Sequence, residues 1–217
     1  MKNNNIITID GPSASGKGTL ARLLALELNF SLLDSGLYYR AYSYAYSLAG
    51  SHKGAKKIFE EYTINNDILN PKIEFQNKNI ISDLRTEKIA SAASALSAEK
   101  ETRSNLIYFQ RNIGFSNGLI ADGRDMGTIV FPEANTKIFL NADQDARALR
   151  RYEELEKKGI DTSYSDIKQE IASRDKSDIE RKISPLIAAE NAVKIDSTNL
   201  SIEEVLTIAL KAFHSEL

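Results

Sequence analysis

The amino-acid sequence predicts an α/β fold: a five-stranded parallel sheet with helices on both faces. Short apolar runs alternate with segments of helical periodicity along the chain, and this alternation is typical of a doubly wound sheet. The predicted strands are residues 6–9, 30–33, 119–121, 137–140 and 193–196. The first three end in polar loops, which we therefore expect to meet at one edge of the sheet, where open α/β folds bind ligands.

A glycine-rich loop follows the first predicted strand and has the pattern of a phosphate-binding loop. It reads Asp10-Gly11-Pro12-Ser13-Ala14-Ser15-Gly16-Lys17-Gly18-Thr19. Glycines let backbone N–H groups approach phosphate oxygens, and the positive end of the following helix faces the same anion. Lys17 adds a charge for the outer phosphates. Leucines at helical spacing follow, which favours a nucleotide site over an ordinary strand-to-helix turn.

The residue after Lys17 differs from the general motif, in which a Ser or Thr hydroxyl binds Mg²⁺. Here Gly18 follows the lysine and the hydroxyl comes one position later, at Thr19. Two interpretations remain open: Thr19 reaches the metal, or water carries more of the coordination.

The composition excludes several classes of site. The chain has 217 residues, of which 42% are hydrophobic and 27% charged, as in ordinary globular proteins. The net charge of −2 gives no general attraction to nucleic acid or to an anionic membrane. The chain has no cysteine and only two histidines, which excludes disulfides, thiolate zinc sites and a histidine metal cluster. With no signal peptide and no apolar run of membrane-spanning length, we expect a cytoplasmic protein.

Residues 51 to about 85 interrupt the alternation of strands and helices. Residues 72–76 and 80–82 flank Asn77-Lys78-Asn79 and are predicted to form a β-hairpin. Two helices are expected next, at 86–96 and 99–113. Before this insertion, a helix over residues 37–48 carries Arg40 in its first turn. A cation there opposes the helix dipole, so Arg40 indicates either an anion in a nearby cleft or a solvated side chain.

Charged residues also follow the third strand and line two later helices. The loop after the third strand reads Asp122-Gly123-Arg124-Asp125-Met126-Gly127. It is either a ligand-binding loop or a polar surface loop. A helix opened by Asp143 carries three arginines that share one face: Arg147, Arg150 and Arg151.

The next helix, opened by Ser163 and Asp166, carries a single stripe. The stripe runs through Ile167, Ile171, Arg174, Asp178 and Arg181. The apolar start of the stripe is expected to pack against the protein, and its charged end is expected to face a cleft. The alternative is a ladder of ion pairs on a solvent-exposed face. Arginine binds phosphate bidentately and stabilises a phosphoryl group in transfer. A phosphate loop together with several arginines therefore suggests a phosphotransferase with a phosphorylated acceptor.

The sequence resembles the cytidylate kinases (CMP kinases) of the nucleoside monophosphate kinase group of P-loop proteins, along nearly the whole chain. The resemblance rests on residues 9–19, Leu33-Asp34-Ser35-Gly36 with Tyr39-Arg40, residues 122–128 with Val130-Phe131-Pro132, Arg174-Asp175 with Asp178 and Arg181, and Asp196-Ser197-Thr198. The Gly-Lys-Gly-Thr form of the phosphate loop is usual for this group.

The resemblance implies a reaction in which ATP and CMP or dCMP give ADP and CDP or dCDP, with Mg²⁺, as part of pyrimidine metabolism. It implies a single kinase domain over residues 1–217. Within it, residues 37–115 form the monophosphate-binding region, with an insert over about 51–95, and residues 147–181 form a helical lid. ATP and CMP are the expected partners, and the small size favours a monomer.

The resemblance also implies a role for each matching residue. The ATP phosphates are held by Gly11, Pro12, Ser13, Ala14, Ser15, Gly16, Lys17, Gly18 and Thr19. The cytosine is read by Ser35, Arg103 and Asp125. The acceptor phosphate is held by Arg40, Arg124 and Arg181. The ribose lies near Ser94, Arg174 and Asp178. Charge on the transferring group is stabilised by Lys17, Arg124, Arg181 and the lid residues Arg147, Arg150 and Arg151. The metal candidates are Thr19 and Asp122.

One departure from the family affects the expected base selectivity. The family usually has a small residue after Gly36, whereas Leu37 and Tyr38 stand here. Three alternatives stay open: a related kinase for UMP, AMP or a small hydroxylated metabolite, a nucleotide-binding switch, and a nucleic-acid-binding ATPase. The number of arginines argues against a switch, and the pI of about 5.8 argues against binding to nucleic acid.

Overall fold

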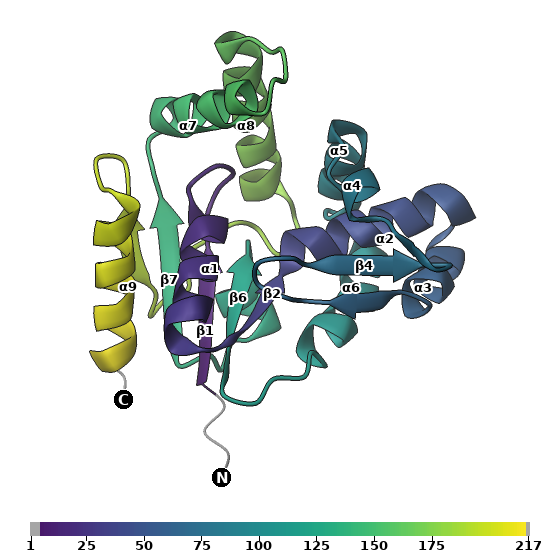
Figure 1. Cartoon of the computed structure of the whole chain (residues 1–217), viewed down its shortest axis with the longest axis horizontal. Coiled ribbons are helices and arrows are strands. Elements are labelled where there is room, and N and C mark those ends of the chain that lie inside the picture. The colour runs from purple at the N-terminus through teal and green to yellow at the C-terminus, as the bar shows by residue number, and fades with distance from the viewer. Residues whose placement is uncertain (1–4, 216–217) are drawn as a thin grey trace.

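A five-stranded parallel sheet forms the centre of the computed structural model, which describes residues 5–215 (Figure 1). Its strands are β1 (Asn5–Asp10), β2 (Ser31–Asp34), β6 (Gly118–Gly123), β7 (Thr136–Asn141) and β8 (Val193–Asp196). Their order across the sheet is β2-β6-β1-β7-β8, and all neighbours are parallel. The predicted fold class and all five predicted strands are confirmed, with bounds shifted by a few residues.

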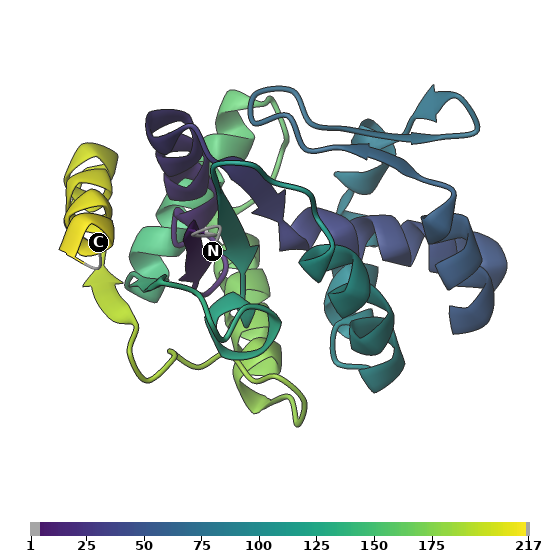
Figure 2. The same ribbon diagram turned by 90° about the horizontal axis from the view of Figure 1, so that it is seen from below.

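Helices surround this sheet and continue into a lobe beside it (Figures 1 and 2). They are α1 (Lys17–Leu28), α2 (Ser35–Ala49), α3 (His52–Glu60), α4 (Ile81–Leu84), α5 (Glu87–Leu96), α6 (Lys100–Arg111), α7 (Gln144–Lys157), α8 (Tyr164–Glu180), α9 (Ile202–Ser215) and a π-helical turn, η1 (Met126–Val130). The lobe also contains a small antiparallel sheet of β3 (Thr63–Asn65), β4 (Lys72–Phe75) and β5 (Lys78–Asn79).

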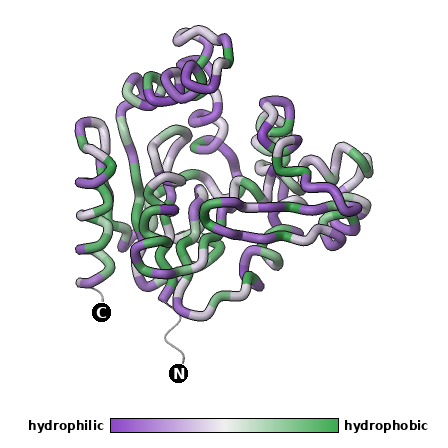
Figure 3. The backbone as a smooth tube through the Cα atoms, in the orientation of Figure 1, coloured by the Kyte–Doolittle hydropathy of each residue, from purple (hydrophilic) through white to green (hydrophobic). Residues whose placement is uncertain are grey.

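Strand residues alternate between two apolar cores, one on each face of the sheet. Ile7 and Ile9 belong to the core under α1 and α9, whereas Ile6 belongs to the core under α2, α6 and η1. Neighbouring β6 alternates in the same way. A parallel sheet covered on both faces needs apolar side chains in both directions, which explains the nearly continuous apolar runs of β1 and β6. The tube in Figure 3 shows these strands as largely hydrophobic and α7 and α8 as mostly hydrophilic.

The predicted hairpin was only partly correct. β4 and β5 do pair antiparallel, but β5 consists of Lys78 and Asn79, which were predicted to lie between the strands, and residues 81–84 form helix α4 where the second strand was predicted. The side chain of Asn79 accepts a hydrogen bond from the Ile81 backbone N–H, at 3.2 Å, and turns the chain there. Ile80 is 1% exposed and packs into the core. In the sequence it stands in a short apolar run, and such a run does not show whether a buried residue belongs to a strand.

Besides α4, two elements of the insert were not predicted: α3 and β3. The start of α3 is marked by Ser51, whose hydroxyl accepts a hydrogen bond from the Gly54 backbone N–H. Its buried face consists only of Ala55 and Phe59, four residues apart, within a polar and basic segment. A segment with so short an apolar stripe looks like a loop in the sequence, and it forms a helix because of its tertiary packing.

Helix ends follow the predicted signals, with shifts of a few residues. Helix α2 begins at Ser35, two residues before the predicted start, because Asp34 accepts a hydrogen bond from the Leu37 backbone N–H at 3.0 Å. Helix α8 ends at Glu180, before Pro185. Ser201 and Glu204 form a reciprocal capping box at the start of α9, which runs to Ser215.

Leu37 and Tyr38 are buried in the core between α2 and the insert. Their side chains are 8% and 4% exposed, and Tyr38 packs on Phe59 with ring centroids 6.0 Å apart. The Tyr38 hydroxyl accepts a hydrogen bond from the side chain of Asn66, at 3.2 Å. The bulk of these two residues therefore fills the base of the insert.

No helix in the described part of the chain is long and apolar enough to span a membrane.

We predict that Gly118→Ala destabilises the fold by about 1–3 kcal/mol, as overpacking of a core does. A Cβ at this position would lie 2.5 Å from the ring of Phe30, which is itself held edge-on against Phe213 at 5.7 Å. Urea unfolding of the two proteins measures the difference. Gly114→Ala is the matched control, because nothing lies within 4 Å of a Cβ there. Equal unfolding midpoints for the two variants would contradict the prediction.

Candidate active site

The loops after β1, β2 and β6 meet at the carboxyl edge of the sheet, as predicted. β6 lies between β2 and β1, with Asp34 paired to Asp122 and Asp10 paired to Gly123 in the strand register. Because all three strands run in the same direction, their loops leave at the same edge and form one site.

The phosphate loop, residues 11–16, runs from β1 into α1 in close contact with β7. A Cβ on Gly11 would lie 2.0 Å from the backbone oxygen of Leu140, so only glycine permits this approach. Gly16 has φ of 90°, in the left-handed region that favours glycine. The loop therefore depends on both glycines of the motif, and it points the first turn of α1 into the site.

Lys17 is buried at the start of α1, and its ammonium group donates a hydrogen bond to the Pro12 backbone oxygen at 3.0 Å. Burial lowers the pKa of Lys17 to about 7, although the nearby Asp122 carboxylate raises it. Burial likewise raises the pKa of Asp122 to about 7, although Lys17 lowers it. A phosphate beside Lys17 would favour its charged form, because an opposite charge nearby stabilises a buried ion.

The two predicted metal residues differ in position. The Asp122 carboxylate lies 3.3 Å from the point that a Cβ on Gly18 would occupy, so it stands beside the position where the general motif has Ser or Thr. Its Oδ1 is buried and has no hydrogen-bond partner among residues 5–215. Thr19 is exposed on α1. Of the two residues, Asp122 fits a hydrated cation at the phosphate loop. No group of three or more metal-ligating residues occurs among the described residues.

All nine residues predicted for the acceptor line one pocket beside the phosphate loop, here named the arginine pocket. Its lining is Ser35, Gly36, Tyr39, Arg40, Ala90, Ala93, Ser94, Ser97, Arg103, Gly123, Arg124, Asp125, Arg174, Asp178 and Arg181. Five arginines against two aspartates give the lining a net charge of +3. Such an excess is suited to a phosphate group. The interpretation of Arg40 and of the α8 stripe as cleft residues is therefore confirmed.

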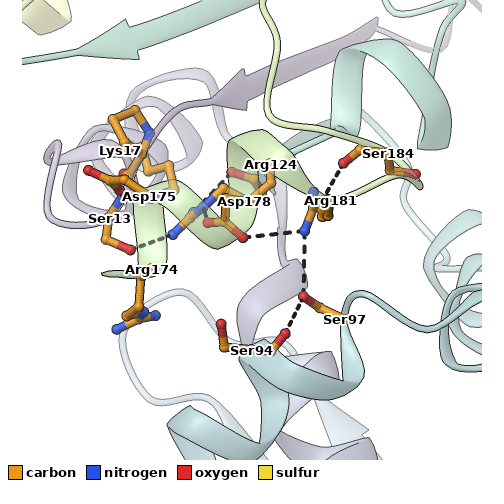
Figure 4. Close-up of polar contacts among 12 residues, drawn as sticks. Ser13, Lys17, Ser94, Ser97, Arg124, Arg174, Asp175, Asp178, Arg181 and Ser184 are labelled. Carbon is orange, nitrogen blue, oxygen red and sulfur yellow. Dashed lines mark hydrogen bonds and ion pairs between the residues drawn. The ribbon is translucent and has the colours of Figure 1, made fainter. Parts of the chain in front are cut away.

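Ion pairs connect the arginine pocket to the phosphate loop (Figure 4). Arg124 donates from Nε to Asp178 Oδ2 at 2.8 Å and from Nη2 to the Ser13 hydroxyl at 3.0 Å. Arg181 donates to Asp178 Oδ1 at 3.3 Å, while its buried Nη2 has no partner in the described chain. One chain of contacts thus runs from the phosphate loop through Arg124 and Asp178 to Arg181.

The far end of the pocket is a layer of buried polar groups around Ser35. Arg103 pairs with the Asp125 carboxylate at 2.7 Å and lies over the Tyr39 ring, 5.6 Å from its centroid. Gln110, 1% exposed, donates to the Ser35 hydroxyl at 2.8 Å. Tyr39 and Gln110 were not predicted as site residues. No sequence signal marks Gln110.

The three arginines on α7 have separate partners. Arg147 is buried and donates to the Ser13 and Ala142 backbone oxygens and to Asp175, whose carboxylate is 2.6 Å away. Arg150 donates to the Ser197 hydroxyl at 3.2 Å, in the loop after β8. Arg151 pairs with Glu87 of α5 and Glu154, both at 3.1 Å. None of the three lines the arginine pocket, and their role in phosphoryl transfer stays a prediction.

A larger cavity, of about 960 Å³, lies at the opposite end of β2 and β6. It is bordered by the end of α1, the β3–β4 loop and the end of α6. Its lining includes Glu60 and Asp67, and no described residue in it is a lysine, arginine or histidine. This charge does not suit a nucleotide phosphate, so the arginine pocket is the candidate active site despite its smaller size.

Comparison with known proteins agrees with this geometry. The family model described as cytidylate kinase matches residues 7–215. A cytidylate kinase from Pasteurella multocida is 42% identical over 231 residues, covering 100% of this chain and 98% of its own. One from Coxiella burnetii is 43% identical over 215 residues, covering 94% and 90%. The chain belongs to the cytidylate kinase family.

Solved structures with low sequence identity share the fold of this cytidylate kinase family member. A protein from Thermus thermophilus superimposes with a TM-score of 0.51 at 18% identity, covering 100% of this chain and 99% of the other. An uncharacterized protein from Eubacterium ventriosum gives a TM-score of 0.50 at 14% identity, covering 98% and 99%. At these identities the likeness concerns the fold alone.

Asp10, the last residue of β1, is a buried carboxylate of this kinase that directly precedes residues 11–16 and does not line the arginine pocket. It is 4% exposed and accepts hydrogen bonds from the backbone N–H groups of Met126 and Gly127, each at 2.8 Å. Burial raises the pKa of Asp10 from 3.8 to about 6, although the two backbone hydrogen bonds lower it.

We predict that Asp10 makes the fold more stable as the pH falls from about 6 to 3.8. In this range the native carboxyl takes up a proton that the unfolded chain has not yet bound, so unfolding releases that proton. Asp10→Asn lacks this contribution. The wild type should therefore gain up to about 3 kcal/mol of unfolding free energy over the variant between pH 7 and pH 4. Urea unfolding of both proteins along this pH series tests the difference, and a constant value would refute it.

Proposed function

We propose that this chain transfers the γ-phosphoryl group of ATP to CMP or dCMP, giving ADP and CDP or dCDP. The observation that carries the proposal is the contact between the two halves of the site. Arg124 lines the arginine pocket and also reaches Ser13 of the phosphate loop, at 3.0 Å. A donor phosphate on the loop and an acceptor phosphate in the pocket would therefore meet at Arg124. The family membership supports the choice of ATP and CMP.

The donor is assigned to residues 11–19, at the start of α1. Backbone N–H groups of the loop and the positive end of α1 favour the phosphate oxygens of ATP. Lys17 contributes a charge that burial alone would weaken and that a bound phosphate restores.

The acceptor is assigned to the arginine pocket in three parts. Arg40, Arg124 and Arg181 would hold its phosphate, and the unpartnered Nη2 of Arg181 offers a donor that the described chain leaves free. Ser35, Arg103 and Asp125 would read the cytosine at the far end. Ser94, Arg174 and Asp178 line the same pocket and would lie near the ribose.

The reaction needs no side-chain nucleophile. An oxygen of the acceptor phosphate attacks the γ-phosphorus in line, and ADP leaves. Lys17, Arg124 and Arg181 would stabilise the charge that spreads over the transferring group. The α7–α8 region would close over ATP as a lid, in which the Arg151 side chain is 30% exposed. Closure excludes water and so limits the hydrolysis of ATP.

The Asp122 carboxylate would orient the hydrated Mg²⁺ that accompanies ATP. Its unpartnered oxygen and its place beside Gly18 fit this role, and a nearby cation would keep the carboxylate charged. When bound, Mg²⁺ neutralises charge on the β- and γ-phosphates. Water would complete the coordination, because Thr19 is exposed on α1.

We further propose that the chain forms a single kinase domain. Residues 37–115 form its monophosphate-binding region, with the insert over about 51–95, and residues 147–181 its lid.

The proposed reaction is tested by measuring ADP formation from Mg-ATP with CMP, dCMP, UMP, AMP and no acceptor. We expect fast turnover with CMP and dCMP, slow turnover with UMP, and almost none without an acceptor. Fast turnover with another acceptor would preserve the kinase assignment and overturn the assignment of cytosine as the acceptor base. ADP release without any acceptor would overturn the kinase assignment in favour of an ATPase.

We predict that Lys17→Ala lowers kcat by about 10³-fold, comparable to the loss of a preorganised oxyanion donor. The fold should survive, because the ammonium group makes a single hydrogen bond, to Pro12. Steady-state kinetics and circular dichroism measure the two effects. Lys56→Ala, at an exposed lysine, serves as control. Near-native turnover in Lys17→Ala would exclude the phosphate role.

We predict that Arg181→Ala raises KM for CMP by more than about tenfold while KM for ATP changes less than threefold, because a charged hydrogen bond is worth about 1.5–3 kcal/mol. Arg181 lies at the far side of Asp178 from the phosphate loop, so its loss should affect the acceptor selectively. The exposed Arg85 supplies the control variant Arg85→Ala. An equal increase for both substrates would place Arg181 at the donor instead.

A further inference from the structure

The loop that carries Arg124 and Asp125 ends in the π-helical turn η1, and the N-terminus of this turn is capped from a distant strand. The first N–H groups of a helical turn have no partner within the turn. Here the N–H groups of Met126 and Gly127 donate to Oδ1 and Oδ2 of Asp10, both at 2.8 Å. Asp10 lies 116 residues earlier in the chain, at the end of β1.

Asp125 occupies the capping position of this turn but does not cap it. Its side chain makes no capping hydrogen bond. Aspartate is among the preferred N-cap residues, and two others in this chain act as such. Asp34 accepts from the Leu37 backbone N–H, and Asp143 accepts from the Asp145 backbone N–H. The Asp125 carboxylate instead pairs with Arg103 inside the arginine pocket, at 2.7 Å.

We propose that Asp10 is a positioning residue of the acceptor site. Its carboxylate caps the turn at Met126 and Gly127 in place of Asp125, and so leaves the Asp125 carboxylate to the arginine pocket and the acceptor base. The proposal deepens the proposed function and rests on it for the identity of the acceptor.

The fit of the loop onto β1 restricts the position of Asp10. A Cβ on Gly127 would lie 2.7 Å from the Thr8 hydroxyl and 3.4 Å from Asp10 Oδ2, so a side chain there would push the loop away from the carboxylate. Met126 is fully buried beneath Gly123. The register pairs Asp10 with Gly123, so the carboxylate and the turn are held by adjacent strands.

Only a carboxylate fits the two donors. An ionised aspartate accepts on both oxygens, whereas asparagine presents one oxygen and an NH₂ group that would face a backbone N–H. Asp10→Asn therefore removes one of the two hydrogen bonds with almost no change in volume. The freed N–H would then compete for the nearby Asp125 carboxylate.

The test is a double-mutant cycle with Asp10→Asn, Asp125→Asn and the combined variant, measured with CMP, UMP and ATP. We expect Asp10→Asn to raise KM for CMP about tenfold, since a lost buried hydrogen bond costs about 1–3 kcal/mol, and KM for ATP less than threefold. The ratio of kcat/KM for CMP over UMP should fall. Because Asp10 acts through Asp125, the combined variant should be no worse with CMP than Asp125→Asn alone.

A matched control separates positioning from general stability. The side chain of Asn135 accepts a hydrogen bond from the Ile6 backbone N–H, at 3.1 Å, near the opposite end of β1. Asn135→Ala removes a similar contact to the same strand and should leave KM for CMP unchanged. Equal increases of KM for CMP and ATP in Asp10→Asn, or additive losses in the combined variant, would overturn the proposal.

Hydrogen exchange tests the cap without any substrate. In Asp10→Asn, the amides of residues 123–131 should exchange faster than in the wild type, with little change elsewhere in the sheet. Unchanged exchange there would overturn the proposal even if the kinetics change. If the wild type fails to phosphorylate CMP, the proposed function is refuted. The exchange rates would still test whether Asp10 holds the turn η1. If Asp10→Asn does not fold, Asp10→Ser, with one accepting oxygen, takes its place in both measurements.

Discussion

The parallel pairing of β1 with β6 is the constraint on which the site depends. It runs in register from Asn5 and Gly118 to Asp10 and Gly123. Strand β1 continues into the phosphate loop, and β6 continues into the loop with Arg124 and Asp125. Because both strands end level at the centre of the sheet, donor and acceptor loops lie side by side. The contact between Ser13 and Arg124, and the cap that Asp10 places on η1, follow from this register.

Buried charge is the second feature of the site. Lys17 and Asp122 have pKa values that burial moves to about 7, and Arg103, Arg124 and Arg181 are each paired with an aspartate. Removing charges from water is costly, and pairing offsets this cost only in part. The two apolar cores on the faces of the sheet stabilise the fold that carries this cost. The buried charges form a preorganised, positively charged pocket that is suited to phosphate chemistry.

The predictions that succeeded depend on contacts between residues close in the sequence, whereas those that failed depend on contacts between distant segments. Caps such as Ser201 with Glu204 act within one turn, and the sequence shows them directly. Strand β3 has three residues and forms only because β4 pairs with it, so no local pattern marks it. The shared face of the α7 arginines was correctly predicted from their spacing. Their partners, which include Ser13 and Glu87, come from distant segments and were not.

The five strands, the phosphate loop, the family and nine of the fifteen residues that line the arginine pocket were predictable from the sequence. Each of these depends on a local period or a short motif. The tertiary structure was needed to show that the Asp122 carboxylate lies against Gly18 while Thr19 is exposed, and that Leu37 and Tyr38 fill the base of the insert. It also assigned the cap of η1 to Asp10. These outcomes depend on distances between segments far apart in the chain, which packing sets and local sequence does not encode.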